Sequence, residues 1–288
     1  MSRCGVARFK SKFGLIKMSH EQANTESNRQ SNEPAMSEQQ RRFSSAESGA
    51  FNTYKNLAIG DGSLLELLGY ELYSIFCMPV PGVIGYGLRQ LVLPLLLKQA
   101  IKPAVGVGVT VRHPSRIKLG RGAMIDDYAV LDIRINKSES ANSSDAALKE
   151  EQFGIEIGER ALVGRGTILC AKNGRITLGT ACNISSYCRI ATQSQVTIGA
   201  STLLAAYAYI GPGNHLTDDP TQPIIEQGMH IQGGVTIGDN VWIGTRATVL
   251  DGVTIGSNAI VGAHSLVRED VPEGAVVAGV PAKIIRYR

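Results

Sequence analysis

Large aromatic side chains are scarce in this sequence. Only 6% of its 288 residues are Phe, Trp or Tyr, whereas 32 are glycine. The composition, 43% hydrophobic and 19% charged, is otherwise that of a globular protein. The expected core is therefore filled by aliphatic rather than aromatic side chains.

A dense basic surface is also missing. The formal net charge is +4, but residues 1–50 contain eight Lys or Arg and five Glu, which leaves the other 238 residues close to neutral. A nucleic-acid-binding protein normally carries a basic face on its folded part. The sequence therefore predicts no nucleic-acid partner.

The sequence also contains no CxxC pair and no apolar run near Met1 of the kind expected for a secretory signal. The five cysteines form no CxxC pair, and their odd number favours a reduced, cytoplasmic protein in which the thiols act as small apolar fillers. No apolar run near Met1 is long enough for a secretory signal, and translation from Met18 or Met36 stays open.

The first hundred residues divide into two parts. Residues 1–55 are expected to be a disordered basic and polar tail, because 19–50 are mostly Ser, Asn, Glu and Gln. Residues 56–103 are expected to be helical and apolar, with a break at Pro79 and Pro81.

The helical part has two competing interpretations. No charge occurs from Leu72 to Leu88, but these 17 residues are at the short end for crossing a bilayer and are interrupted by prolines. Residues 63–101 either cap the open end of the following domain or lie on a membrane surface as an amphipathic segment. The sequence favours the cap.

A six-residue repeat over 104–273 predicts the fold. Aliphatic residues recur at every sixth position, and this is the period of a solenoid with three flat faces to a coil. The clearest run is Ile237, Ile243, Val249, Ile255, Val261 and Val267. Gly, Asn and Asp at the expected corners suit turns with positive φ; they include Gly158, Gly238, Asn240, Asp251, Gly252 and Asn258.

Interruptions of the repeat predict where loops leave the solenoid. Leu131 and Ile157 are 26 residues apart, and Ile210 and Ile237 are 27 apart, which implies long loops at 132–152 and 211–233. Both interruptions, and two smaller ones, follow the third face of a coil. The two loops are therefore expected at the same edge of the solenoid, two or three coils apart, and long loops in compact domains usually carry function.

His215 is the candidate catalytic residue of the second loop. It follows a predicted strand closely, behind Gly211, Pro212 and Gly213. Acyl transfer from a thioester needs a base that accepts a proton near pH 7, and backbone N–H groups that bind the oxyanion. Asp218 or Asp219 could orient the imidazole. The alternatives are a solvated loop histidine and hydrated carboxylates.

The sequence resembles the hexapeptide-repeat acyltransferases, a family that includes galactoside, maltose, nodulation-sugar and xenobiotic O-acetyltransferases. The resemblance rests on the hexad run, Asn214-His215, the segment GDNVWIG and the closing VAGVPAKIIR. The resemblance covers about 104–288. It implies an all-β, left-handed parallel β-helix of about six coils, preceded by the helical segment and the tail. It also implies a homotrimer with active sites between subunits, acetyl-CoA as donor and His215 as general base.

The resemblance assigns further residues by position. Trp242 matches the family's tryptophan beside the catalytic histidine, and Thr245 and Ala263 match corners that contact the pantetheine arm. Lys283 and Arg286, in the C-terminal segment 274–288, match cations near the CoA phosphates. Asn214, Asp218, Asp219 and Trp242 are candidates for orienting His215 or binding the acceptor.

Two positions depart from the family pattern. Arg268-Glu269 replaces a common Thr-Lys or Thr-Arg pair, and His264 stands where the family usually has a small residue. We therefore do not assign to these residues the contacts with the CoA donor that the family makes at these positions.

Several functions remain open at this stage. A sugar hydroxyl in surface polysaccharide or lipopolysaccharide synthesis is the expected acceptor, followed by an antibiotic hydroxyl and an amino-sugar nitrogen. A γ-type carbonic anhydrase would need three histidines around zinc, but His113, His215, His230 and His264 lack local ligand spacing, so no metal is predicted. A non-enzymatic scaffold would not need the loop that carries His215. An enzyme near lipid-linked acceptors would lie in the cytoplasm, at the inner face of the membrane.

Overall fold

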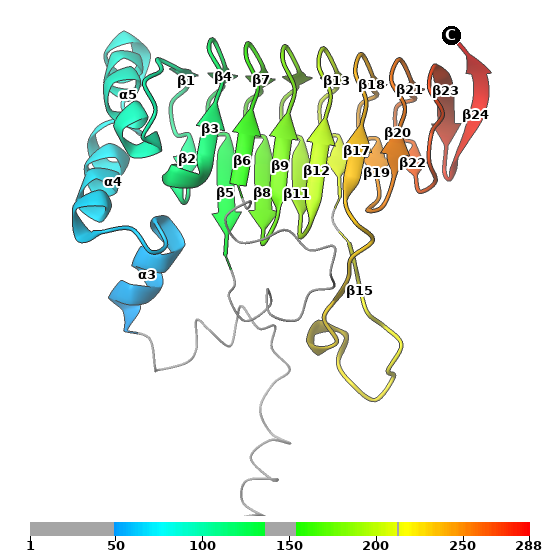
Figure 1. Cartoon of the computed structure of the whole chain (residues 1–288), viewed down its shortest axis with the longest axis horizontal. Helices are drawn as coiled ribbons and strands as arrows, with labels where there is room; N and C mark the ends of the chain where they lie inside the picture. The colour runs from blue at the N-terminus through cyan, green and yellow to red at the C-terminus, as the bar shows by residue number, and fades with distance from the viewer. Residues whose placement is uncertain (1–48, 136–153, 212) are drawn as a thin grey trace, which may run out of the picture. The chain divides into compact units, whose positions relative to one another are not determined.

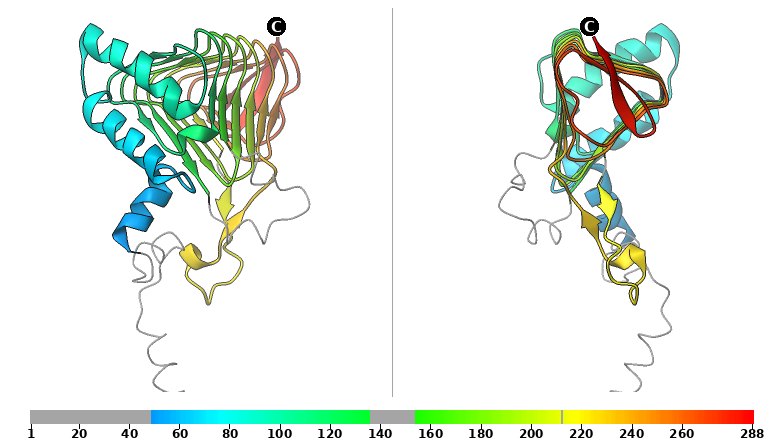
Figure 2. Two further views of the ribbon diagram at one scale, coloured as in Figure 1. Left: turned by 60° about the vertical axis from the view of Figure 1, so that its left-hand side comes forward. Right: turned by 90° about the vertical axis from the view of Figure 1, so that its right-hand side faces the viewer.

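The computed structural model describes residues 49–135, 154–211 and 213–288. Three helices come first: α3 (Ala50–Ala58), α4 (Leu64–Phe76) and α5 (Gly82–Leu97). The chain then winds through short parallel strands in three sheets, whose triangular cross-section is visible along the axis (Figure 2). The predicted left-handed parallel β-helix is confirmed.

The strands fall into three sheets, which we name A, B and C. Sheet A contains β1 (Ala104–Val105), β4 (Met124–Ile125), β7 (Leu162–Val163), β10 (Asn183–Ile184), β13 (Leu203–Leu204), β18 (Trp242–Ile243), β21 (Ile260–Val261), β23 (Ala275–Gly279) and β24 (Ala282–Tyr287). Sheet B contains β2 (Thr110–Val111), β5 (Val130–Arg134), β8 (Ile168–Lys172), β11 (Arg189–Thr192), β14 (Tyr209–Ile210), β19 (Thr248–Val249) and β22 (Leu266–Val267). Sheet C contains β3 (Ile117–Leu119), β6 (Gly154–Ile157), β9 (Arg175–Leu178), β12 (Gln195–Ile198), β17 (Val235–Ile237) and β20 (Thr254–Ile255).

These strands make six complete coils and part of a seventh. Val105 and Val111 belong to a complete first coil, because β3 supplies its third face after the short 3-10 helix η1 (Pro114–Arg116). The seventh coil ends at a bridge between Ile255 and Val271, and the hairpin β23–β24 extends sheet A beyond it. The helices lie at one end of the coils and β24 at the other (Figure 1).

The six-residue period corresponds to one inward side chain on each face. The inward residues of successive coils pair in register, as in the sheet B row Val111, Leu131, Leu169, Ile190, Ile210, Val249 and Val267. All of these side chains are buried, and each contributes about 1.5–3 kcal/mol by leaving water.

Two of the predicted corner glycines are needed for a different reason than expected. Gly158 and Gly238 do not have positive φ; a Cβ at Gly238 would lie 2.6 Å from the backbone N of Ser257 in the next coil. The prediction of positive φ was right for Asn240, Gly252 and Asn258. Coil stacking therefore selects glycine at corners by close approach as well as by backbone angle.

The predicted tail is too long at its C-terminal end. Helix α3 begins at Ala50, inside the range 1–55 expected to be disordered. Its last turn is held by distant residues, since the backbone N of His113 donates to the Ala58 carbonyl at 2.8 Å and His113 Nε2 lies 2.9 Å from the Asn56 carbonyl oxygen. Burial lowers the pKa of His113, which favours the neutral ring, and in that ring Nε2 carries the proton that it donates to this carbonyl. Residues 1–48, and most of the predicted loop 132–152, lie outside the described residues.

Arg89 fastens the helices to the first coil. Its side chain, 2% exposed, donates to the carbonyl oxygens of Val105 (2.9 Å), Cys77 (2.9 Å) and Val80 (2.6 Å). Tyr73 and Leu93 are buried against the same coil. One face of the helical segment therefore covers the open end of the β-helix.

The four described cysteines are buried and free, which fits their expected role as apolar fillers. Burial raises the pKa of Cys182 to about 12 and that of Cys188 to about 11. These thiols consequently remain protonated and unreactive near neutral pH.

Candidate functional site

His215 lies on a short antiparallel hairpin that leaves the corner between sheets B and C. Strand β15 (Asn214–His215) pairs with β16 (Met229–His230), and both residues of β15 are exposed. The hairpin begins directly after β14, at Gly211. This residue has φ +74° and lies so close to coil four that a Cβ would be 2.1 Å from the Ala191 carbonyl oxygen. Glycine is therefore required where the hairpin emerges.

The base of this hairpin is held by Asp251, which sequence analysis treated only as a turn residue. Its carboxylate accepts hydrogen bonds from the backbone N–H of Gln232 (2.6 Å) and of Gly234 (2.8 Å). Asp251 occupies the sheet B–C corner of coil six, directly after β19. Charge-assisted bonds of this kind are short and strong, and they fix the strand that pairs with β15.

We predict that Asp251→Asn lowers kcat about 10- to 100-fold, because a loosened hairpin misplaces His215. The KM for acetyl-CoA, the donor that the sequence leads us to expect, should change little. Steady-state rates of CoA release at varied donor concentration measure both constants.

The matched control is Asp239→Asn. Asp239 also accepts a backbone N–H from a neighbouring coil, that of Ala200 at 2.6 Å, but at a corner away from the hairpin. Equal kcat losses in the two variants would mean that Asp251 acts only through general stability.

The tip of the loop, Thr217–Gly228, forms a unit closed by its own side chains. Gln227 donates to the carbonyl oxygens of Asp219 (2.7 Å) and Gln222 (2.9 Å). The Asp219 carboxylate accepts from the Thr221 hydroxyl (2.5 Å) and backbone N–H (2.9 Å), and these bonds lower the pKa of Asp219. Asp219 is therefore engaged within its own loop, and Asp218 is exposed on the same segment.

Among the residues that the structure describes, no side chain hydrogen-bonds the His215 imidazole. A base without an orienting group is free to rotate, which is unfavourable for proton transfer.

The predicted donor-binding residues gather around a different corner, between sheets A and B. Thr245 and Ala263 lie there in coils six and seven, and the His264 backbone N–H donates to the Thr245 carbonyl at 2.8 Å. The Thr245 hydroxyl donates to the Ala206 carbonyl at 2.6 Å. Trp242 projects from the adjoining strand of sheet A and is 51% exposed.

This corner continues into an aromatic stack that was not predicted. Tyr187 and Tyr207 lie one coil apart, with ring centroids 5.5 Å apart and planes at 13°. The Arg246 guanidinium lies 5.5 Å from the centroid of the Tyr207 ring. The signal was present in the sequence, because the two tyrosines are 20 residues apart, the same spacing as that of the aliphatic positions Ile184 and Leu204. Exposed stacked rings offer flat apolar surfaces to a ligand.

The predicted phosphate-binding cations lie on β24. Lys283 Nζ is 3.6 Å from the Glu269 carboxylate, which also pairs with Arg268 at 3.6 Å. Arg286 donates to the Tyr287 carbonyl at 3.2 Å. These groups are exposed, so their pairs are weak and a phosphate could replace Glu269 as the partner of Lys283.

Within one chain, the two groups of predicted residues do not meet. Each strand of sheet B runs from the A–B corner to the B–C corner. Thr245 and Ala263 lie at the A–B corner, and the hairpin with His215 leaves the B–C corner. The width of sheet B therefore separates the candidate base from the candidate donor groove.

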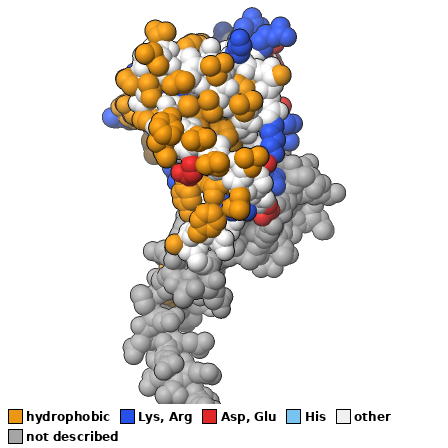
Figure 3. All heavy atoms as spheres, turned by 90° about the vertical axis from the view of Figure 1, so that its left-hand side faces the viewer, with side chains coloured by type: hydrophobic (Ala, Val, Ile, Leu, Met, Phe, Trp, Pro, Cys, Tyr) orange, Lys and Arg blue, Asp and Glu red, His pale blue; other side chains and the backbone are white. Residues whose placement is uncertain are grey.

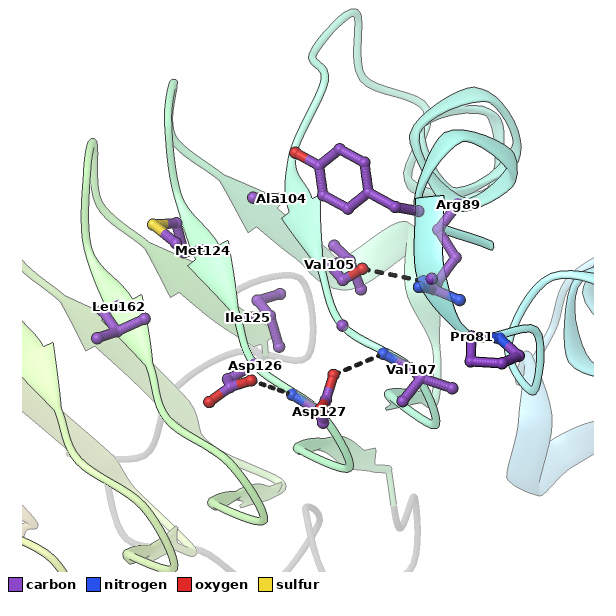
Figure 4. Close-up of a pocket in the computed structure, with 13 residues that line it drawn as sticks. Pro81, Arg89, Ala104, Val105, Val107, Met124, Ile125, Asp126, Asp127 and Leu162 are labelled. Atoms are coloured by element: carbon purple, nitrogen blue, oxygen red, sulfur yellow. Dashed lines mark hydrogen bonds between the residues drawn. The ribbon is translucent and has the colours of Figure 1, made fainter. Parts of the chain in front are cut away.

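A hollow of about 570 Å³ lies elsewhere, between α5 and the first coils (Figure 4). Its polar groups are used within the fold: Asp127 accepts from the Val107 N–H at 2.9 Å and pairs with Arg165 at 2.8 Å, and Arg89 turns toward the Val105 carbonyl. It contains none of the predicted site residues. Within the described ranges, no three His, Cys, Asp or Glu side chains are grouped to hold a metal ion.

Comparison with known proteins places the repeat in a family. The family described as bacterial transferase hexapeptide (six repeats) matches residues 230–269. The lipopolysaccharide biosynthesis O-acetyl transferase WbbJ of Escherichia coli (strain K12) is 40% identical over 143 residues, which cover 47% of this chain and 69% of WbbJ. Nodulation protein L of Rhizobium meliloti is 40% identical over 129 residues, covering 45% and 68%.

Two further matches differ in coverage and identity. Acetyltransferase Rv3034c of Mycobacterium tuberculosis is 35% identical over 134 residues, and the match spans 44% of that protein's length. A solved maltose O-acetyltransferase from Clostridium difficile 630 is 19% identical, with coverage of 78% of this chain and 89% of that one and a TM-score of 0.37.

Proposed function

Because the chain belongs to the family of hexapeptide-repeat acetyltransferases, we propose that it transfers the acetyl group of acetyl-CoA to a hydroxyl group of a sugar, with His215 as general base. The name of one relative supports this acceptor class, and a second relative has the same sequence identity. WbbJ is named for lipopolysaccharide biosynthesis, and nodulation protein L is a relative of similar identity.

The proposed reaction needs one proton acceptor and one oxyanion site. The His215 imidazole removes the proton of the acceptor hydroxyl as its oxygen attacks the thioester carbonyl carbon. Backbone N–H groups bind the resulting oxyanion. The carbon–sulfur bond then breaks, the acetyl ester remains on the acceptor, and the CoA sulfur receives the proton from the imidazolium.

One observation carries the proposal of a shared site: sheet B separates His215 from the corner with Thr245 and Ala263. A neighbouring subunit placed beside sheet B would bring its A–B corner to this hairpin. Head-to-tail contacts of this kind close into a ring when the rotation between subunits is a third of a turn. We therefore propose a homotrimer with three active sites between subunits.

The outward surfaces of the sheets are consistent with this assembly. The outward row of sheet A is apolar at seven of eight positions: Ala104, Met124, Leu162, Asn183, Leu203, Trp242, Ile260 and Val276. The corresponding row of sheet C is polar: Lys118, Glu156, Thr177, Thr197, Thr236 and Thr254. An apolar row next to the donor corner favours burial there, and the polar row favours solvent contact of sheet C.

Mixed trimers test the shared site. His215→Ala removes the base, and Ala263→Glu places bulk and negative charge in the donor groove, so each variant alone should lose CoA release in the presence of a sugar acceptor. The two variants are co-expressed, and mixed trimers are purified through two different tags. These mixed trimers should regain activity, because some interfaces combine an intact His215 with an unchanged Ala263. Mixed trimers that stay inactive would show that both residues must come from one chain.

A further inference from the structure

Helices α4 and α5 leave one apolar face uncovered, which we call the helical apolar face. Its exposed side chains include Leu65 (78% exposed), Ile84 (74%) and Leu95 (75%). The full set is Leu64, Leu65, Leu68, Leu72, Ile75, Phe76, Val83, Ile84, Leu91 and Leu95. Figure 3 shows hydrophobic side chains gathered across this end, with basic side chains along its edge.

The sequence places these side chains on one side of each helix. In α4, Leu65, Leu68 and Leu72 follow helical spacing, while Leu67, Tyr70 and Tyr73 on the other side are buried. The buried side already covers the first coil. The exposed side is therefore not needed to cover the β-helix. Soluble monomers seldom expose apolar patches beyond a few hundred Å².

The charged residues near this face indicate which kind of partner it binds. Residues 49–118, which form the helices and the first coil, contain seven Lys or Arg and three Asp or Glu, whereas the rest of the described chain has no such basic excess. None of the three acids is free: Glu66 pairs with Lys98 at 2.9 Å, the Tyr54 hydroxyl donates to Glu71, and Asp61 also has a partner. Three of the cations are engaged as well, since Arg89 is buried, Lys98 pairs with Glu66 and Arg112 pairs with Asp132. The basic excess of this region therefore rests on others, such as the exposed Lys102 and Lys118.

This pattern fits an anionic lipid surface. Interfacial helices insert a flexible aliphatic face to the depth of the acyl boundary, and nearby lysines interact with anionic headgroups. Protein-binding hot spots are instead enriched in Trp, Tyr and Arg, whereas eight of the ten side chains here are Leu or Ile. None of the described helices is long and apolar enough to cross a bilayer.

We propose that the helical apolar face docks the enzyme on the surface of a membrane that contains anionic phospholipids. The contact is peripheral, through the exposed side of α4 and α5, while their buried side stays on the first coil. This goes beyond acyl transfer and does not depend on it.

Vesicle sedimentation of the full chain tests the proposal. The protein should sediment with phosphatidylcholine vesicles that contain phosphatidylglycerol, and less with phosphatidylcholine alone. The triple variant Ile84→Ser, Leu91→Ser, Leu95→Ser should bind at least about tenfold more weakly, because three inserted side chains become polar. Lys102 is exposed and lies between α5 and β1, so Lys102→Gln should weaken binding to the anionic vesicles about fivefold.

The matched control is Ile285→Ser, since Ile285 is 65% exposed but lies on β24 at the other end of the coils. It should bind vesicles like the wild type. The proposal is overturned if the wild type does not bind, or if the triple variant binds equally well. It is also overturned if the triple variant changes the oligomeric mass by light scattering, because the face would then join copies of the chain. Vesicle binding by an enzyme that proves inactive would still support it.

Discussion

Replacing His215 by alanine is expected to lower the rate of CoA release about 100- to 10,000-fold, the usual contribution of a general base. The hairpin itself should remain, because β15 and β16 pair through their backbones and Asp251 holds their base. Oligomeric mass and the circular dichroism spectrum should therefore match those of the wild type. The rate is measured with a panel of sugars and antibiotics as acceptors, which also identifies the acceptor class.

His230→Ala is the matched control for this experiment. His230 is likewise exposed, and it lies on the partner strand of the same hairpin, opposite Asn214. It should retain most of the activity. If His230→Ala were inactive and His215→Ala active, the general base would be His230 on β16, and our assignment of His215 would be wrong.

Replacing Arg89 by methionine is expected to lower the free energy of unfolding by about 4 kcal/mol. Methionine fills much of the same space but leaves the carbonyl oxygens of Val105, Cys77 and Val80 buried without their donor. Such unsatisfied groups cost about 1–3 kcal/mol each. Urea unfolding at one fixed protein concentration measures the change, since assembly contributes to apparent stability.

Lys98→Met provides the comparison. It removes the exposed ion pair of Lys98 with Glu66 and should cost less than about 1 kcal/mol. If Arg89→Met were no more harmful than Lys98→Met, water must replace the guanidinium, and Arg89 would not be what fastens the helices to the first coil.

The fold could be predicted because its repeat is local. Each face of a coil has room for one inward aliphatic side chain, so the six-residue period marks the core directly, as in Ile190 and Ile210 of sheet B. Interruptions of that period could only occur at corners, and both long insertions do leave sheet B, after β5 and after β14. The position of the hairpin with His215 followed from this.

What the sequence did not reveal depends on contacts between distant residues. Helix α3 was missed because its last turn is held by His113, more than fifty residues later, and not by its own polar sequence. Asp251 looks like any corner residue until the coils stack and bring Gln232 and Gly234 beside it. The cap and the membrane segment were weighed as rivals, whereas α4 and α5 each have a buried side and an exposed one.

The pairing of the coils on either side of the hairpin has a consequence for divergence. Strand β17 pairs with β12, and β18 with β13, in the same register as every other coil, despite the insertion between β14 and β17. A change in the length of the loop at this corner therefore alters the hairpin and leaves the strand pairing of sheets A, B and C unchanged. Exchange of the hairpin tip would therefore leave the corner with Thr245 and Ala263, which we propose as the donor groove, in place.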